Sequence, residues 1–227
     1  MKILAAECSA SSVSCAIEID GKIAAHSFSN QKITHSQTLL PMISSVLKSA
    51  NVTPKEIDAF AVSAGPGSFT GVRIGISAIK GMATPFNAKC FGVSTLEAIA
   101  YNYKDTDCIA CAVMDARCNQ VYNALFRISG GTVTRLTQDR AIMIDELLTD
   151  LSSYNEKIII IGDGTHLFSN YITDNIILAE EDRRNQTAIG VIHAAKNYTP
   201  VTYGELLPTY LRLPQAEREL KAKLERK

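Results

Sequence analysis

Two carboxylates, Glu7 and Asp115, stand where a nucleotide-binding protein could use them, because each ends a strand-like stretch. In phosphotransferases an acid at such a turn orients a divalent metal and the phosphates. The turn also needs a glycine, so that phosphate can approach the backbone. Here Cys8-Ser9-Ala10 follows the first acid and Ala116-Arg117 follows the second. Both acids therefore remain only weak candidates for binding a nucleotide cofactor.

A glycine-rich block, Gly65-Pro66-Gly67-Ser68-Phe69-Thr70-Gly71, invites comparison with phosphate-binding loops. A P-loop needs Lys and then Ser or Thr after its last glycine, but Val72 and Arg73 stand there. A Rossmann loop follows the first strand of a β-α-β unit, whereas three strand-like stretches come first here. The block therefore predicts a tight turn that leads into a closely packed helix.

Small residues form a stripe on the helix expected over 70–83. Gly71, Gly75, Ala78 and Met82 fall on one helical face. A glycine inside a helix costs ~1 kcal/mol relative to alanine, so two on one face indicate that a neighbouring helix approaches the backbone. That neighbour could be the chain's own helix near 35–50 or a helix of a second protein, and periodicity does not separate the two.

Cysteines and histidines do not combine into a metal site by their spacing. Cys108 and Cys111 form a CxxC at the start of an expected strand, where they point to opposite faces, and no second CxxC completes a zinc set. None of the four histidines has a partner at the i, i+4 spacing of metal ligands on a helix. We expect no catalytic residue, no metal and no cofactor of the chain's own, and reduced thiols.

The elements that position these residues repeat along the chain. Strands are expected at 2–8, 13–19, 22–28, 58–63 and 88–93, and helices at 35–50 and 70–83. The order begins again with strands at 109–115, 120–128, 132–137 and 158–161, and helices at 144–151 and 186–197. This predicts an α/β chain of two β-β-β-α-β-α lobes, 1–103 and 104–200. A segment over 201–227 is expected to pack back on the first lobe and to end in a charged tail.

Composition limits the possible function classes. The 227 residues are 46% apolar and 20% charged, which is enough to bury a core without disulfides. The 23 basic and 23 acidic residues give a net charge of zero, which disfavours strong binding of nucleic acid by the chain alone. No apolar run reaches the ~18 residues of a membrane span, and the N-terminus does not read as a signal peptide. We expect a cytoplasmic protein that does not contact a membrane.

Five segments together resemble the TsaB, or YeaZ, family of bacterial proteins, and the resemblance runs from residue 1 to about 217. The segments are Ala61 to Gly75, His35-Ser36-Gln37 with Leu40-Pro41, Gly92-Val93-Ser94-Thr95-Leu96, Asp115-Ala116-Arg117 with Val121-Tyr122, and Pro208-Thr209-Tyr210-Leu211-Arg212. One departure is Glu7, where the family usually has Asp in an Ile-Asp-Thr start.

The resemblance implies that the chain has a duplicated actin/Hsp70-like (ASKHA) fold. It also implies that the chain is a non-catalytic subunit that dimerises with a partner in a complex and activates it. In the family's complex, threonylcarbamoyl moves from its adenylate to N6 of the adenosine beside the anticodon of ANN-decoding tRNAs. TsaD carries the catalytic site and TsaE is an ATPase, so ATP and the metal act in partner subunits. The chain would meet tRNA only through the complex. Two alternatives stay open, an autonomous actin-fold ATPase or kinase and a glycoprotease-like hydrolase.

The resemblance and the small-residue stripe together predict a docking surface for TsaD on the helices over 35–50 and 70–83. The residues assigned to it are His35, Leu39, Ile43, Val46, Gly71, Gly75, Ala78 and Met82. An apolar surface of this kind is unfavourable in water, so a homodimer is expected when TsaD is absent. On this interpretation Gly75→Leu should weaken docking in a chain that still folds.

Overall fold

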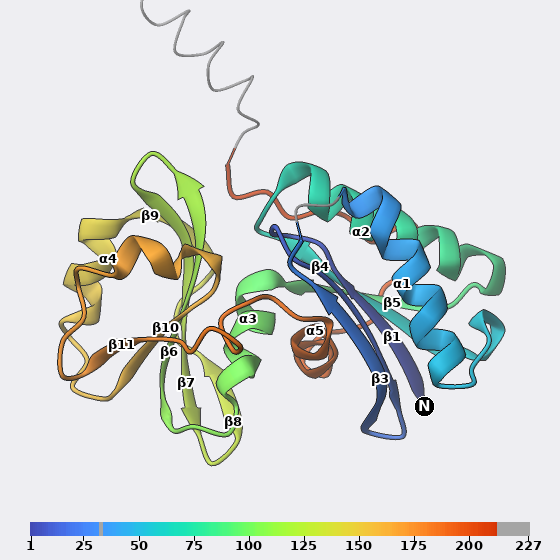
Figure 1. The fold of residues 1–227 in the computed structure, drawn as a ribbon, viewed down its shortest axis with the longest axis horizontal. Coiled ribbons are helices and arrows are strands. Elements are labelled where there is room, and N and C mark those ends of the chain that lie inside the picture. The colour runs from blue at the N-terminus through green and yellow to red at the C-terminus, as the bar shows by residue number, and fades with distance from the viewer. Residues whose placement is uncertain (32–33, 213–227) are drawn as a thin grey trace, which may run out of the picture.

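The computed structural model describes residues 1–31 and 34–212, which form two α/β lobes side by side (Figure 1). The sheet of the first lobe has the order β3-β2-β1-β4-β5. Its strands are β1 (Lys2–Glu7), β2 (Val13–Ile19), β3 (Lys22–Ser29), β4 (Ala59–Gly65) and β5 (Lys89–Ser94). The first three form the predicted antiparallel meander, and β4 and β5 continue the sheet in parallel with β1. The helices α1 (His35–Ser49) and α2 (Phe69–Ala83) cover one face of this sheet.

The second sheet repeats this plan with the order β11-β10-β6-β7-β8, and β9 pairs with β7. Its strands are β6 (Cys108–Arg117), β7 (Gln120–Ser129), β8 (Thr132–Arg135), β9 (Arg140–Met143), β10 (Ile158–Ile161) and β11 (Ile176–Leu178). The helix α4 (Ile144–Leu151) covers one face. A short 3-10 helix, η4 (Asp163–Phe168), stands after β10, where the first lobe has α2 after β4. The predicted duplication of an antiparallel meander followed by parallel strands is therefore confirmed.

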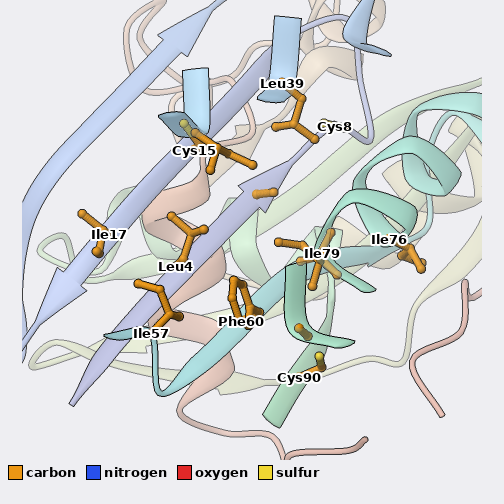
Figure 2. Packing of buried hydrophobic residues seen from close by; sticks show 14 of the residues in the cluster. Leu4, Cys8, Cys15, Ile17, Leu39, Ile57, Phe60, Ile76, Ile79 and Cys90 are labelled. Carbon is orange, nitrogen blue, oxygen red and sulfur yellow. The ribbon is translucent and has the colours of Figure 1, made fainter. Parts of the chain in front are cut away.

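Alternating side chains of the strands build the cores on the two faces of each sheet. In β1, Leu4 packs with Phe60 and Ile79 beneath α1 and α2 (Figure 2), whereas Ile3 faces the opposite side of the sheet. The four isoleucines of β10 are all buried, as expected for a central parallel strand that is covered on both faces.

Two helices, one from each lobe's part of the sequence, pack against the sheet of the other lobe. The helix α3 (Thr95–Ala100) follows β5 but buries Leu96 and Ile99 against the second sheet. The helix α5 (Ala188–Ala195) follows the second sheet but buries Val191 and Ile192 against the first. The sequence pattern places α5 in the range 104–200 and does not predict α3, β9 or β11. The chain therefore crosses between the lobes twice, and α3 and α5 lie where the lobes meet (Figure 1).

The last described residues return to the first lobe. Val201 and Cys90 exchange two backbone hydrogen bonds of 2.8 and 2.9 Å, and Leu206 is buried in the core beneath α1 and α2. The segment Pro208–Arg212, here called the strap, then runs past the end of β4. The charged tail that the sequence predicts after it lies outside the described residues.

Candidate functional site

A cleft of about 690 Å³ opens between the lobes. The turn after β1, the start of α2, the end of β6 and η4 surround it. The polar side chains that line it are Ser9, Ser11, Ser68, Asp115, Arg117, Tyr122, Asp163 and His166. The fold thus brings Asp115 to the cleft, together with hydroxyl groups and a second carboxylate.

Glu7 does not reach this cleft, because its carboxylate is fully buried and turned into its own lobe. The backbone N–H and the hydroxyl of Ser9 both donate to Oε1 at 2.5 Å, and the Ser63 hydroxyl donates to Oε2. Burial raises the pKa of Glu7 above its usual range, against the opposing effect of these hydrogen bonds. Glu7 therefore fixes the turn after β1, and neither carboxylate oxygen faces the cleft.

Asp115 reaches the cleft, but the adjoining turn provides its partners. Its Oδ1 accepts a hydrogen bond of 2.7 Å from the Arg117 backbone, and its Oδ2 lies 3.3 Å from the guanidinium of the same residue. Arg117, Cys118 and Asn119 all have positive φ angles, which fold the turn tightly back on Asp115. Of the two acids that the sequence marks as candidates, only Asp115 faces the space between the lobes, whereas Glu7 is buried in the first lobe.

Asp163 is the cleft residue that the sequence pattern misses. It opens η4, and its Oδ1 accepts a hydrogen bond of 3.0 Å from Gln186 Nε2. Burial, with a contribution from the nearby charge of Asp115, raises the pKa of Asp163 to about 6. The turn Gly162-Asp163-Gly164 follows β10 as Gly65-Pro66-Gly67 ends β4, and this equivalence could have assigned Asp163 to the cleft from the sequence. No group of three metal-ligating side chains occurs in residues 1–31 and 34–212.

The two glycines of the small-residue stripe face the chain's own core. A Cβ on Gly71 would lie 2.0 Å from the carbonyl oxygen of Cys8, and a Cβ on Gly75 would lie 3.1 Å from Val62 Cγ2. The close neighbours are therefore the turn after β1 and the strand β4, and not a helix. This corrects the assignment of Gly71 and Gly75 to the docking surface, because α2 needs both glycines in order to lie against its own sheet.

The apolar positions that the sequence assigns to α1 are also internal. Leu39, Ile43 and Val46 are 1%, 2% and 2% exposed and belong to the core of the first lobe, so the assignment of Ile43 and Val46 to the docking surface is corrected, whereas Leu39 also borders the groove described next. His35 is half-buried at the start of α1, where its Nε2 lies 2.7 Å from the Ala10 carbonyl oxygen. Amphipathic periodicity finds the buried face of such a helix, and this face is occupied by the chain itself.

A groove of about 570 Å³ between α1 and α2 presents the other face of both helices. Leu40 is 53% exposed beside it, and Ile74 and Ala78 are half-buried. Ser36, Thr70, Arg73 and Ser77 complete its walls around Leu39. Met82 lies half-buried further along α2. Of the predicted docking residues, Ala78 and the almost fully buried Leu39 therefore line this groove, and Leu40 and Ile74 are apolar residues there that the sequence analysis does not assign to it.

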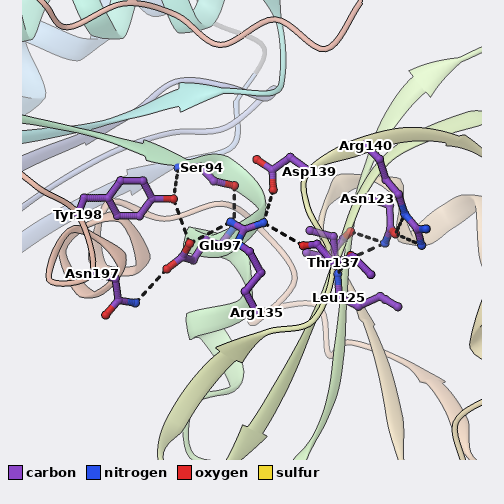
Figure 3. Close-up of polar contacts among 12 residues, drawn as sticks. Ser94, Glu97, Asn123, Leu125, Arg135, Thr137, Asp139, Arg140, Asn197 and Tyr198 are labelled. Atoms are coloured by element: carbon purple, nitrogen blue, oxygen red, sulfur yellow. Dashed lines mark hydrogen bonds and ion pairs between the residues drawn. The ribbon is translucent and has the colours of Figure 1, made fainter.

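A polar network joins the lobes on another side of the interface (Figure 3). Glu97 of α3 is 7% exposed and accepts hydrogen bonds from Arg135 of β8 at 2.9 Å, Asn197 at 2.9 Å and Tyr198 at 3.0 Å. Arg135 also contacts Asp139 at 2.6 Å. Because Asn197 and Tyr198 follow α5 on the first lobe, these bonds connect the two sheets through a buried carboxylate.

The cysteines behave as the sequence predicts in the part of the chain that the structure describes. Cys108 and Cys111 are buried free thiols, and burial raises their pKa values to about 11 and about 12. Such thiols are inert as nucleophiles at neutral pH. Cys118 is exposed on the turn beside Asp115. Among the described helices none has the length and apolar character that a bilayer crossing requires.

Comparisons of the sequence with known proteins show the family of the chain. Residues 22–196 match the family model of TsaD, tRNA N6-adenosine threonylcarbamoyltransferase. The chain is 28% identical to the tRNA threonylcarbamoyladenosine biosynthesis protein TsaB of Bacillus subtilis, with 96% of each chain covered. It is 31% identical to the TsaB protein of Escherichia coli, with 72% of each chain covered.

Solved structures agree with the fold. The structure of YeaZ from Pseudomonas aeruginosa has a TM-score of 0.78 at 22% identity, and 92% of this chain aligns with 99% of that one. A second structure, of a Pseudomonas aeruginosa protein described as similar to peptidase YeaZ, has a TM-score of 0.81 and 23% identity and aligns with 93% of this chain and 99% of its own length. The expected α/β, actin-like fold of two lobes is thereby confirmed. Because relatives match in sequence over most of their length and solved structures share both lobes, the chain belongs to the TsaB, or YeaZ, family of tRNA threonylcarbamoyladenosine biosynthesis proteins.

Proposed function

We propose that this chain is a non-catalytic subunit that activates a TsaD-like tRNA N6-adenosine threonylcarbamoyltransferase by docking on it. The observation that carries the proposal is the groove between α1 and α2, with Leu40 largely exposed beside it. An apolar groove on a helix pair fits a partner helix that lays an apolar face into it. The match of this chain itself to the TsaD family model supports a partner of related fold.

The interlobe cleft supports a role without chemistry of the chain's own. Both oxygens of Glu7 are taken up by Ser9 and Ser63, and Asp115 is paired with Arg117. Neither acid is then free to orient a metal–phosphate group in the way that phosphoryl transfer requires. In the proposed complex ATP and the metal act in partner subunits, and the isolated chain does not transfer threonylcarbamoyl to tRNA.

The remaining features of the complex belong to the same proposal. TsaE joins the larger assembly, tRNA is reached only through the complex, and the protein works in the cytoplasm. Without TsaD the groove pairs two copies of the chain, since an exposed apolar surface is unfavourable in water. A specific interface of either kind buries at least ~1,000 Å² in total.

The test is a charge placed in the groove. Leu40→Asp adds a carboxylate that docking would bury without a partner, so affinity for the transferase from the same organism should fall by at least tenfold. Ile172→Asp is the matched control, because Ile172 is 55% exposed against 53% for Leu40 but lies on the second lobe. Binding is measured by calorimetry, and tRNA modification is assayed with all subunits present. Equal affinity of both variants for the transferase would exclude the groove as the docking site.

A further inference from the structure

The strap joins three parts of the molecule. The Thr209 backbone N–H donates a 2.7 Å hydrogen bond to the carbonyl oxygen of Ala64, at the end of β4. The Tyr210 ring stacks on Phe69 at the start of α2, with 4.6 Å between the ring centroids. Arg212 donates a 2.5 Å hydrogen bond to the carbonyl oxygen of Ala116 on the second lobe. The strap therefore has specific contacts at the end of β4, on α2 and beside the interlobe cleft.

One side chain connects the strap to the groove. Arg73 lines the groove between α1 and α2, and its Nε donates a 2.7 Å hydrogen bond to the Tyr210 hydroxyl. The guanidinium also lies over the Tyr210 ring, 5.5 Å from its centroid. Tyr210 itself does not line the groove. Because the ring is held by Phe69, it fixes the direction of an arginine side chain that would otherwise sample many rotamers.

Among the described residues, the Arg73 side chain forms a hydrogen bond through Nε, and its two terminal nitrogens have no hydrogen-bond or ion-pair partner there. They therefore remain as donors at the wall of the groove, and paired donors of a guanidinium match the two oxygens of a carboxylate. A held arginine binds a carboxylate at a lower entropic cost than a freely rotating one. The groove thus offers one charged contact beside its apolar floor.

We propose that Tyr210 is a positioning residue that holds Arg73 in the groove wall, where Arg73 binds a carboxylate on the docked partner. This inference rests on the proposed function, because it names the chemistry of that same docking surface. It also gives a role to the Pro208-Thr209-Tyr210-Leu211-Arg212 motif, which lies outside the groove.

The experiment measures the affinity of the full chain for the TsaD-like transferase from the same organism. Tyr210→Phe keeps the stacking on Phe69 but removes the hydrogen-bond acceptor, so affinity should fall about three- to tenfold. Tyr171→Phe is the matched control, because Tyr171 is also 40% exposed but lies on the second lobe. It should bind within about twofold of the unmodified chain.

A double-mutant cycle separates positioning from a general structural effect. If Tyr210 acts through Arg73, Tyr210→Phe should cause no further loss of affinity in an Arg73→Met background. Arg73→Met should also reduce the salt dependence of binding, since it removes a charge pair. Unchanged affinity of Tyr210→Phe, or an equal loss in both backgrounds, would overturn the inference while leaving the docking proposal intact. Failure of the unmodified chain to bind the transferase would overturn the proposed function and this inference with it.

Discussion

The three glycines of α2 provide a graded test of how the first lobe is packed. Each is replaced by alanine, which adds one Cβ at a different depth in the same helix. For Gly81 that atom would meet no neighbour within 4 Å. For Gly75 it would lie 3.1 Å from the Val62 side chain, and for Gly71 it would lie 2.0 Å from the Cys8 carbonyl oxygen. The order of stability should therefore follow the order of these contacts.

The size of each effect follows from two opposing contributions to the free energy of unfolding. Alanine favours a helix interior over glycine by up to ~1 kcal/mol, so Gly81→Ala should stabilise the chain by ~0.5–1 kcal/mol. At Gly75 the same gain is offset by a shift of the Val62 methyl of a few tenths of an ångström, which leaves the net change near zero. At Gly71 the backbone of the turn after β1 must move, and overpacking of this kind costs ~1–3 kcal/mol or more.

Urea unfolding of the unmodified chain and the three variants, followed by circular dichroism, gives the measurement. In a thermal scan of the same four proteins, the midpoint should shift by ~2–4 °C per kcal/mol for a chain of this length. The larger change Gly75→Leu should destabilise the lobe as well, in contrast to the expectation from the sequence that it would affect docking alone. A Gly71→Ala variant as stable as the unmodified chain, or a Gly81→Ala variant that is the least stable of the three, would contradict this packing of α2 against its own sheet.

Two further predictions concern buried charge. The pKa of Asp163 is raised from 3.8 to about 6 in the folded chain, so its stabilising contribution is complete below pH ~4 and is lost as the pH rises through 6. Asp163→Asn should therefore lose less stability than the unmodified chain between pH 4 and pH 7 when urea midpoints are compared, and parallel pH profiles would contradict this. Arg135→Met should cost ~3 kcal/mol because it leaves the Glu97 carboxylate buried without its cation. Adding Glu97→Gln should recover part of that loss in the same denaturation assay, and a double variant that is no more stable than the single one would show that the pair does not act in this way.

The alternating and helical patterns of apolar residues predicted most of the strands, and most of the helices that pack on the sheet of their own lobe. The run Ile158–Ile161 and the helix Ile144–Leu151 appear at the predicted bounds. The helix α3 was missed because its six residues are too few to show a helical period, and all six are buried, including the polar Thr95 and Glu97. Which lobe covers α5 could not be predicted, because an apolar stripe does not specify the sheet against which it packs.

The candidate site was predicted less completely, for a physical reason. Small and apolar residues at helical spacing, such as Leu39 and Gly75, mark the face that is buried, and in a free chain that face packs on its own sheet. The accessible groove depends instead on Leu40 and Ile74, which break the pattern. Glu7 and Asp115 were found as strand-end acids, but only side-chain geometry shows that one turns inward while the other faces the cleft.

The exchange of α3 and α5 between the lobes has a consequence for synthesis on the ribosome. One face of the first sheet is covered by Val191 and Ile192, which are translated about a hundred residues after its last strand, β5. That face of the first sheet therefore stays uncovered until most of the chain has emerged from the ribosome. Contacts so distant in sequence slow folding, and exposed sheet faces aggregate during such a delay. Chaperone dependence of the newly made chain should accordingly end when α5 leaves the exit tunnel, and not when residue 103 does.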